Sequence, residues 1–166
     1  MNKYLKMRDE NQKKISNFNM FFAFSKEQFE EGLEKMKLTE KEIEKLVSIG
    51  GGGYILKKDR EKFDLMFEEI QKSQDKAIEN DISGENFIFD MFKYELNNHE
   101  YSYTWEIDET LEVLGITKKE INKKSNLLNG LNLAIESIKK YQEEIDEKEE
   151  KEEKEEKEEK ERKNKK

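Results

Sequence analysis

The chain of 166 residues contains no cysteine, no proline and a single histidine. Without cysteine it can form neither a disulfide bond nor a thiolate metal site. One histidine cannot supply the histidine clusters that hold most catalytic zinc ions. The usual groups for hydrolysis or metal chemistry are therefore scarce, and we predict a protein with no catalytic residues, no metal site and no cofactor.

Long apolar runs are also missing from the sequence. No stretch approaches the roughly 20 apolar residues that span a bilayer, and residues 2–14 have no apolar core of the kind found in a signal peptide. We therefore expect a protein of the cytoplasm, in a bacterial host cell, that makes no contact with a membrane.

Charge is abundant: 43% of the residues are charged and 33% are hydrophobic, a composition that leans toward disorder. Much of the excess lies in residues 146–166, where a Glu-Glu-Lys repeat supplies 11 acidic and 9 basic residues and no apolar one. A period of three does not match the 3.6-residue helical turn, so this segment has no apolar face to bury. We predict a charged tail, either disordered or a solvated helix.

The rest of the chain holds all ten phenylalanines, enough to form a core. We predict an N-terminal arm or short helix at residues 1–17 and a single α+β domain at residues 18–145. A small antiparallel sheet packed by helices, with a long C-terminal helix, is the expected fold. Its predicted strands lie near residues 18–24, 46–49 and 54–56, with 101–105 as a candidate fourth.

Helix starts are marked by three pairs that resemble capping boxes: Ser25 with Gln28, Thr39 with Glu42, and Thr117 with Glu120. Ser83 is a further predicted start, of a helix that ends near Asn98. Gly115 is predicted to close a short helix that Asp108 caps. The last helix is expected to run on from Thr117, with Gly130 as a point where it could break.

Four consecutive glycines, Gly50 to Gly53, separate two apolar runs and predict a hairpin turn, because glycine adopts positive φ without strain. A phosphate-binding loop would need Gly-Lys-Ser/Thr after the glycines, and Tyr54, Ile55 and Leu56 follow instead. Besides the plain turn, we keep open a contact with a partner through Gly51, Gly52, Gly53 and Tyr54.

Residues 87–105 hold the only histidine and the only tryptophan of the chain. Tyr101, Tyr103 and Trp105 alternate with small polar residues, which predicts an extended segment with all three rings on one face. Acidic neighbours, among them Glu100, would repel nucleic-acid phosphates. An exposed ring here therefore favours a protein partner over direct nucleic-acid binding, and core packing of at least two rings is the competing interpretation.

His99 follows Glu95 by four residues, a spacing that would place both side chains on one helical face. A metal site would need further ligands, and only carboxylates are nearby. A histidine that interacts with the C-terminal end of a helix is the simpler interpretation. Acid–base catalysis by His99 with Glu95 or Glu100 is the rival hypothesis.

Three segments in order along about 100 residues carry a family resemblance: FFAFS-x-x-QF from Phe21, SIGGGGYI from Ser48, and DMFKYELNNHEY from Asp90, which DETLEVLGIT follows from Asp108. They resemble a family of small uncharacterised proteins encoded by phages and other mobile elements. The resemblance implies a small protein made by a mobile element in a bacterium, with an anti-CRISPR role among its candidate roles. It implies no catalytic residue.

We therefore hypothesise a non-enzymatic acidic interaction protein that inhibits a host defence nuclease by blocking its basic nucleic-acid-binding surface. The expected partner is a larger host protein such as an RNA-guided nuclease. Candidate contact residues are Glu95, His99, Glu100, Tyr101, Tyr103 and Trp105, with Gly51 to Tyr54 as a second contact. The alternatives are a small hydrolase using His99, and a structural or regulatory protein acting as an oligomer; the chain itself is expected to be a monomer or small homo-oligomer.

Overall fold

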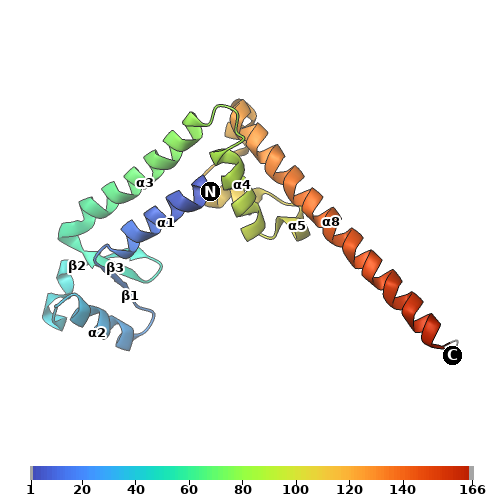
Figure 1. Cartoon of the computed structure of the whole chain (residues 1–166). Helices are drawn as coiled ribbons and strands as arrows, with labels where there is room; N and C mark the ends of the chain where they lie inside the picture. The colour runs from blue at the N-terminus through green and yellow to red at the C-terminus, as the bar shows by residue number, and fades with distance from the viewer. Residues whose placement is uncertain (1, 165–166) are drawn as a thin grey trace. The chain divides into compact units, whose positions relative to one another are not determined.

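The computed structural model describes residues 2–164, with side chains up to residue 157, and has the predicted α+β fold (Figure 1). The chain divides into two compact units, one of residues up to Leu5 together with those from Ala77 onward, the other of Lys6–Lys76. The predicted single domain at residues 18–145 thus contains parts of both units. In chain order the elements are α1 (Lys3–Ser16), β1 (Met20–Phe22), α2 (Lys26–Lys35), the 3-10 helix η1 (Glu40–Lys45), β2 (Leu46–Gly50), β3 (Gly53–Leu56), the 3-10 helix η2 (Lys57–Asp59), α3 (Arg60–Asn80), α4 (Phe87–Asn98), α5 (Tyr101–Thr104), α6 (Asp108–Leu114), α7 (Lys118–Lys123) and α8 (Ser125–Asn164).

The Lys6–Lys76 unit is built on a three-stranded antiparallel sheet in the order β1-β3-β2. The predicted hairpin joins β2 to β3, with positive φ at Gly50, Gly51 and Gly52. Helix α2 packs on β1, and Phe21 of β1, Leu33 of α2, Met36 at the end of α2 and Leu46 of β2 form a buried cluster. Two further rings extend it, because Phe21 stacks on Tyr54 at 5.3 Å and both contact Phe29.

Helix α2 begins where its sequence predicts. Ser25 adopts extended backbone angles, and its hydroxyl accepts a hydrogen bond from the Gln28 N–H. The Gln28 side chain accepts from the N–H of Phe24, one residue before the position that a capping box requires. The predicted start is therefore confirmed, while the return bond of the box goes to Phe24.

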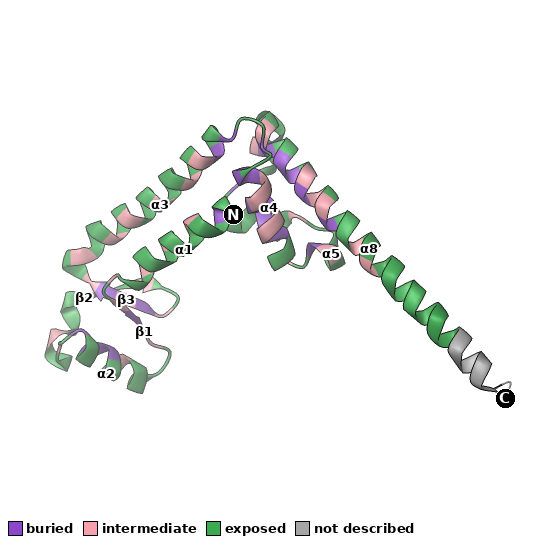
Figure 2. Ribbon diagram, viewed as in Figure 1, coloured by how far each residue is buried: buried purple, intermediate pink, exposed green. Residues whose placement is uncertain are grey.

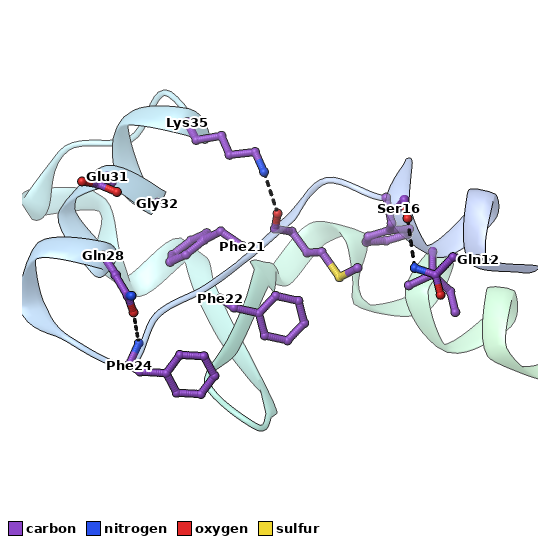
Figure 3. A pocket seen from close by; sticks show the side chains of 12 residues that line it. Gln12, Ser16, Phe21, Phe22, Phe24, Gln28, Glu31, Gly32 and Lys35 are labelled. Atoms are coloured by element: carbon purple, nitrogen blue, oxygen red, sulfur yellow. Dashed lines mark hydrogen bonds between the residues drawn. The ribbon is translucent and has the colours of Figure 1, made fainter. Parts of the chain in front are cut away.

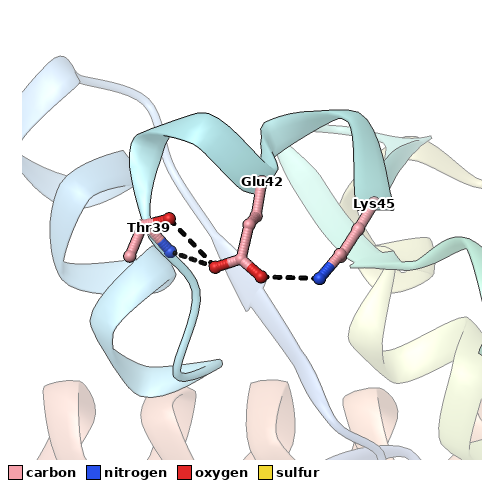
Figure 4. Close-up of polar contacts among 3 residues, drawn as sticks. All are labelled: Thr39, Glu42 and Lys45. Atoms are coloured by element: carbon pink, nitrogen blue, oxygen red, sulfur yellow. Dashed lines mark hydrogen bonds and ion pairs between the residues drawn. The ribbon is translucent and has the colours of Figure 1, made fainter.

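The capping box at Thr39 forms with both of its partners, and the helix that follows it is the 3-10 helix η1 (Figure 4). Glu42 Oε2 accepts hydrogen bonds from the Thr39 N–H and hydroxyl at 3.0 and 2.9 Å, and Lys45 Nζ lies 2.5 Å from Glu42 Oε1. Lys45 first, and then Thr39, lower the pKa of the Glu42 carboxyl from 4.5 to about 2. The carboxylate is thus stabilised in the folded chain by neighbours on both sides.

We expect Glu42 to make the stability of this unit depend on pH in the acid range. Because its folded pKa lies below its unfolded value, its contribution is complete above pH 4.5 and is lost as the pH falls through about 2. A carboxyl-detected NMR titration should give a Glu42 midpoint near 2. The Glu42→Gln variant should lose this part of the pH dependence, and a wild-type midpoint of 4 or more would contradict the account.

The other unit is centred on the packing of α4 against the first half of α8, which is the most extensive contact between elements in the described chain (Figure 1). The side chains of Ile88, Met91, Phe92 and Leu96 on α4 are fully buried. Buried positions on α8 stop at Ile138, and its residues from Asp146 to Lys157 are exposed (Figure 2). The tail predicted from residue 146 is a continuation of α8 that buries no side chain as far as residue 157.

The N-terminal segment forms helix α1, one of the two predicted alternatives, and its first turn is anchored on α4. The Lys3 N–H donates to Asp90 Oδ2 at 2.9 Å. Tyr4 is buried, its ring lies 5.8 Å from that of Phe87, and its hydroxyl donates to Glu95 Oε1 at 2.5 Å. Position 1 of the predicted arm lies outside the described residues, as do positions 165 and 166 of the tail.

The predicted start of α4 at Ser83 is wrong, because the helix begins at Phe87. Asp81 organises this turn, since its carboxylate accepts hydrogen bonds from the backbone N–H groups of Gly84, Asn86 and Ile88. The N–H groups of Asn86 and Ile88 are among those that a helix start leaves without partners inside the helix, while the bond to Gly84 closes the preceding turn. A buried aspartate five residues ahead of the cap position therefore replaces the local serine cap.

Glycines at the crossing of this turn with α8 allow the two backbones to meet. A Cβ on Gly84 would lie 2.1 Å from the Asn126 carbonyl oxygen, and one on Gly130 would lie 2.7 Å from the Gly84 carbonyl oxygen. Gly130 is therefore a packing position, and the break considered possible there does not occur, because α8 runs through it. The interruption falls earlier, at Lys124, which adopts extended angles between α7 and α8.

No helix within the described part of the chain is long and apolar enough to cross a membrane.

Candidate interaction surface around Trp105

The end of α4 places His99 between two carboxylates. His99 is the C-terminal cap of the helix, and its N–H donates to the Glu95 carbonyl at 3.0 Å. Its Nε2 lies 3.7 Å from Glu95 Oε2 and its Nδ1 lies 3.6 Å from Glu109 Oε2 on α6. Glu95 is buried, and its carboxylate also accepts a hydrogen bond from the Tyr4 hydroxyl, so it connects α1 to α4.

This arrangement fits the helix-end interpretation of His99 and gives Glu95 a packing role. The predicted exposed contact at Glu95 is therefore wrong, because only 2% of the residue is accessible. Among the described residues, no group of three or more histidine, aspartate or glutamate side chains could hold a metal ion. The side chains around His99 thus join α1, α4 and α6 to one another.

Residues 101–105 do not form the predicted extended segment. Tyr101–Thr104 make the single helical turn α5, which lies between two residues in left-handed backbone conformation, Glu100 at φ 53° and Trp105 at φ 56°. The three rings therefore do not share a face: Tyr101 is buried, Tyr103 is 84% exposed and Trp105 is 51% exposed. Burial raises the pKa of the Tyr101 hydroxyl, in keeping with a ring that has left solvent.

Trp105 is held in place although half of it is accessible. Its ring meets Tyr101 edge-to-face at a centroid distance of 5.5 Å, and Lys139 Nζ from α8 lies 5.9 Å from its centroid. Aromatic pairs and cation–π contacts of this kind contribute about 0.5–1.5 kcal/mol each. A fixed, half-exposed tryptophan loses little conformational entropy on binding, which suits it to an interface.

Along the sequence, the residues that flank these rings carry charge of one sign, while Lys139 of α8 reaches Trp105 from outside the run. We call Tyr94 to Thr117 the acidic segment. It has six acidic residues and no lysine or arginine, although the whole chain contains 32 lysine and arginine residues. Five of the six are exposed: Glu100, Glu106, Asp108, Glu109 and Glu112. Asp108 forms an ion pair with Lys118 at 2.5 Å, just beyond the end of the segment. The acidic segment therefore presents negative charge beside Tyr103 and Trp105.

Two residues of this surface were missed by the sequence interpretation. Glu112 and Val113 lie on the exposed side of α6, and Val113 is 59% accessible. The absence of basic residues between positions 94 and 117 is the signal that could have found Glu112. No signal in the sequence distinguishes Val113 from a core residue.

The predicted second contact lies in the other unit, at the tip of the β2–β3 hairpin. Gly51 is open to solvent. A Cβ on Gly52 would lie 2.8 Å from the Phe24 ring, and a Cβ on Gly53 would lie 3.1 Å from the Phe22 ring, so both glycines leave room for these rings. Tyr54 packs into the ring cluster with Phe21. The glycines thus serve the turn and the packing of two exposed phenylalanine rings.

The fold and this surface define a small α+β protein with an acidic, ring-bearing helical turn. The chain belongs to the family of unknown function DUF7659, whose model matches residues 3–137. The match covers α1 through the packed half of α8 and leaves out the Glu-Glu-Lys repeat. No curated protein and no solved structure matches the chain.

Proposed function

We propose that the protein is a non-enzymatic interaction protein of a phage or other mobile element, active in the bacterial cytoplasm. It inhibits a host defence nuclease of the kind that anti-CRISPR proteins block, by occupying a basic nucleic-acid-binding surface with its acidic segment. The observation that carries the proposal is the run of 24 residues without lysine or arginine, Tyr94 to Thr117, in which five exposed acidic residues flank the exposed Tyr103 and Trp105 along the chain.

Charge complementarity supports this choice of partner. A surface that binds nucleic acid is rich in lysine and arginine, and a cluster of carboxylates competes for it as phosphates do. Such charge speeds association, while aromatic side chains at the centre supply most of the affinity of an interface. Tyr103 and Trp105 are the aromatic side chains that the acidic segment offers to a partner.

Backbone strain at this turn also supports a functional role. Left-handed φ values at Glu100 and Trp105 cost of order 1 kcal/mol or more each for residues other than glycine. By contrast, glycine occupies the left-handed position at Gly115 in the same segment. At Glu100 and Trp105 the chain thus keeps the carboxylate and the indole that glycine would remove.

Charge reversal tests the proposal. The double variant Glu106→Lys/Glu112→Lys changes two exposed positions of the acidic segment and should weaken capture of the partner from host lysate at least about tenfold. Wild-type capture should also fall when ionic strength rises from about 50 to 300 mM, because salt screens exposed charges. The captured protein should be a basic nuclease, and its cleavage activity should be inhibited by the wild-type chain.

The matched control is Glu61→Lys/Glu69→Lys, which makes the same change in net charge at exposed positions of α3. It should alter capture by less than about twofold, because α3 lies outside the acidic segment, while the overall charge is the same as in the test variant. Equal loss in both variants would mean that only net charge matters. Full inhibition by the Glu106→Lys/Glu112→Lys variant would contradict the proposed surface.

A further inference from the structure

Strand β1 lies at an edge of the sheet, where within the described chain its one strand partner is β3. The Ala23 N–H donates to the Gly52 carbonyl at 2.9 Å, which makes this a hydrogen-bonded pair. Such pairs alternate along an antiparallel ladder, so the main-chain groups of Phe21 also face β3, while those of Met20 and Phe22 face outward. Lys35 Nζ approaches the Met20 carbonyl oxygen from that outer side, at 3.5 Å (Figure 3).

The two edges of the sheet differ in how they are protected. Edge strands usually carry charged residues, proline or a bulge that prevents another strand from pairing. β2 has a register shift between Ser48 and Gly50, which interrupts its regular strand geometry. β1 consists of Met20, Phe21 and Phe22, with neither charge nor bulge. Apart from the Lys35 ammonium group at the Met20 carbonyl oxygen, the outer edge of β1 carries none of these protections, and the main-chain groups of Phe22 are placed to pair with a further strand.

A groove of about 720 Å³ runs along this edge, with residues of α1 at one end and residues of α2 at the other (Figure 3). Of its twelve lining residues only Glu31 and Lys35 are charged, and their charges are opposite. This is low for a chain in which 43% of residues are charged. Two of the lining rings are exposed, Phe22 by 53% and Phe24 by 78%.

These features select one kind of occupant. The outward N–H and C=O groups of Phe22 need a main-chain partner, which an extended peptide supplies and a helix does not. The neutral lining favours an uncharged segment over the acidic or basic runs that are common in this chain. The edge of β1 in a second copy is bordered by that copy's own α1 and α2. Pairing two such edges would bring both sets of helices into one groove, which disfavours a second copy as the occupant.

We propose that the outer edge of β1 is a docking site for an extended, uncharged segment of a partner protein, which joins the sheet as a fourth strand. Its main chain pairs with Met20 and Phe22, and its alternate side chains contact the rings of Phe22 and Phe24. The groove contains no residue of the acidic segment, so a negative result for one of the two proposals leaves the other standing.

The test selects peptides from a random dodecapeptide library against the full chain. Enriched peptides should be uncharged with β-branched or aromatic residues at alternate positions, and a bound peptide should slow exchange of the Phe22 amide hydrogen about tenfold or more. Phe22→Lys should weaken binding at least about tenfold, since it puts a charge on the edge. The matched control Leu65→Lys changes a residue of similar exposure, 49%, on α3 outside the groove, and should bind as wild type.

Three results would overturn the proposal. One is the absence of any enriched peptide, and another is equal binding by wild type and Phe22→Lys while thermal unfolding shows that both are folded. The third is a dimer of the chain in sedimentation that Phe22→Lys dissociates, because the occupant would then be a second copy.

Discussion

Gly84→Ala is expected to destabilise the chain by about 3 kcal/mol, from left-handed strain of roughly 1–2 kcal/mol together with an overpacking cost of similar size. Gly84 has φ 78°, and an added Cβ would lie 2.1 Å from the Asn126 carbonyl oxygen. That atom belongs to backbone, so no side-chain rotation can relieve the contact. Either the turn after α3 or the first turn of α8 must move, and both hold α4 in place.

Urea unfolding of Gly84→Ala beside Gly115→Ala separates the two contributions. Gly115 has φ 65° in the same unit, and a Cβ added there would have no neighbour within 4 Å. Gly115→Ala should therefore show the strain alone, about 1 kcal/mol. Equal losses in the two variants would show that the close approach of α8 to this turn contributes nothing to stability.

Glu95→Ala is the second change with a large expected effect, a loss of about 3 kcal/mol in the free energy of unfolding. The substitution removes buried methylene groups and leaves the Tyr4 hydroxyl without its carboxyl acceptor. Tyr4→Phe keeps the ring contacts with Phe87 and Tyr94 and should cost about 1–2 kcal/mol. Both variants loosen the attachment of α1 to α4.

A double-mutant cycle measures this attachment. Tyr4→Phe/Glu95→Ala should cost less than the sum of the single changes by about 1 kcal/mol or more, because the residues share one hydrogen bond. The exposed Glu112→Ala on α6 is the control and should change stability by less than about 0.5 kcal/mol. Strict additivity, or a Glu95→Ala loss as small as the control, would contradict the proposed role of Glu95.

Local signals in the sequence predicted local structure well. The glycine run predicted the β2–β3 hairpin, and Ser25 and Thr39 predicted the starts of α2 and η1. Gly115 ends α6 with left-handed φ as predicted. Each of these depends on contacts within a few residues, which the sequence contains.

Features that depend on distant neighbours were not predictable in the same way. Alternation at Tyr101 to Trp105 matches a strand, but burial of Tyr101 between α4 and α8 makes a helical turn with strained ends. The role of Gly130 requires knowing that the Gly84 turn crosses α8. For the candidate surface, Tyr103 and Trp105 were found from composition, whereas burial of Glu95 depends on Tyr4, 91 residues away in the chain.

The central claim is that the acidic segment, residues 94–117, is the surface that contacts the partner. Hydrogen exchange of the full chain, alone and bound to the protein it captures from the host, tests this claim most directly. We predict slower exchange at the exposed amides around Tyr103, Trp105 and Glu112, by about tenfold or more. Protection confined to other parts of the chain, with these amides exchanging as in the free protein, would contradict it.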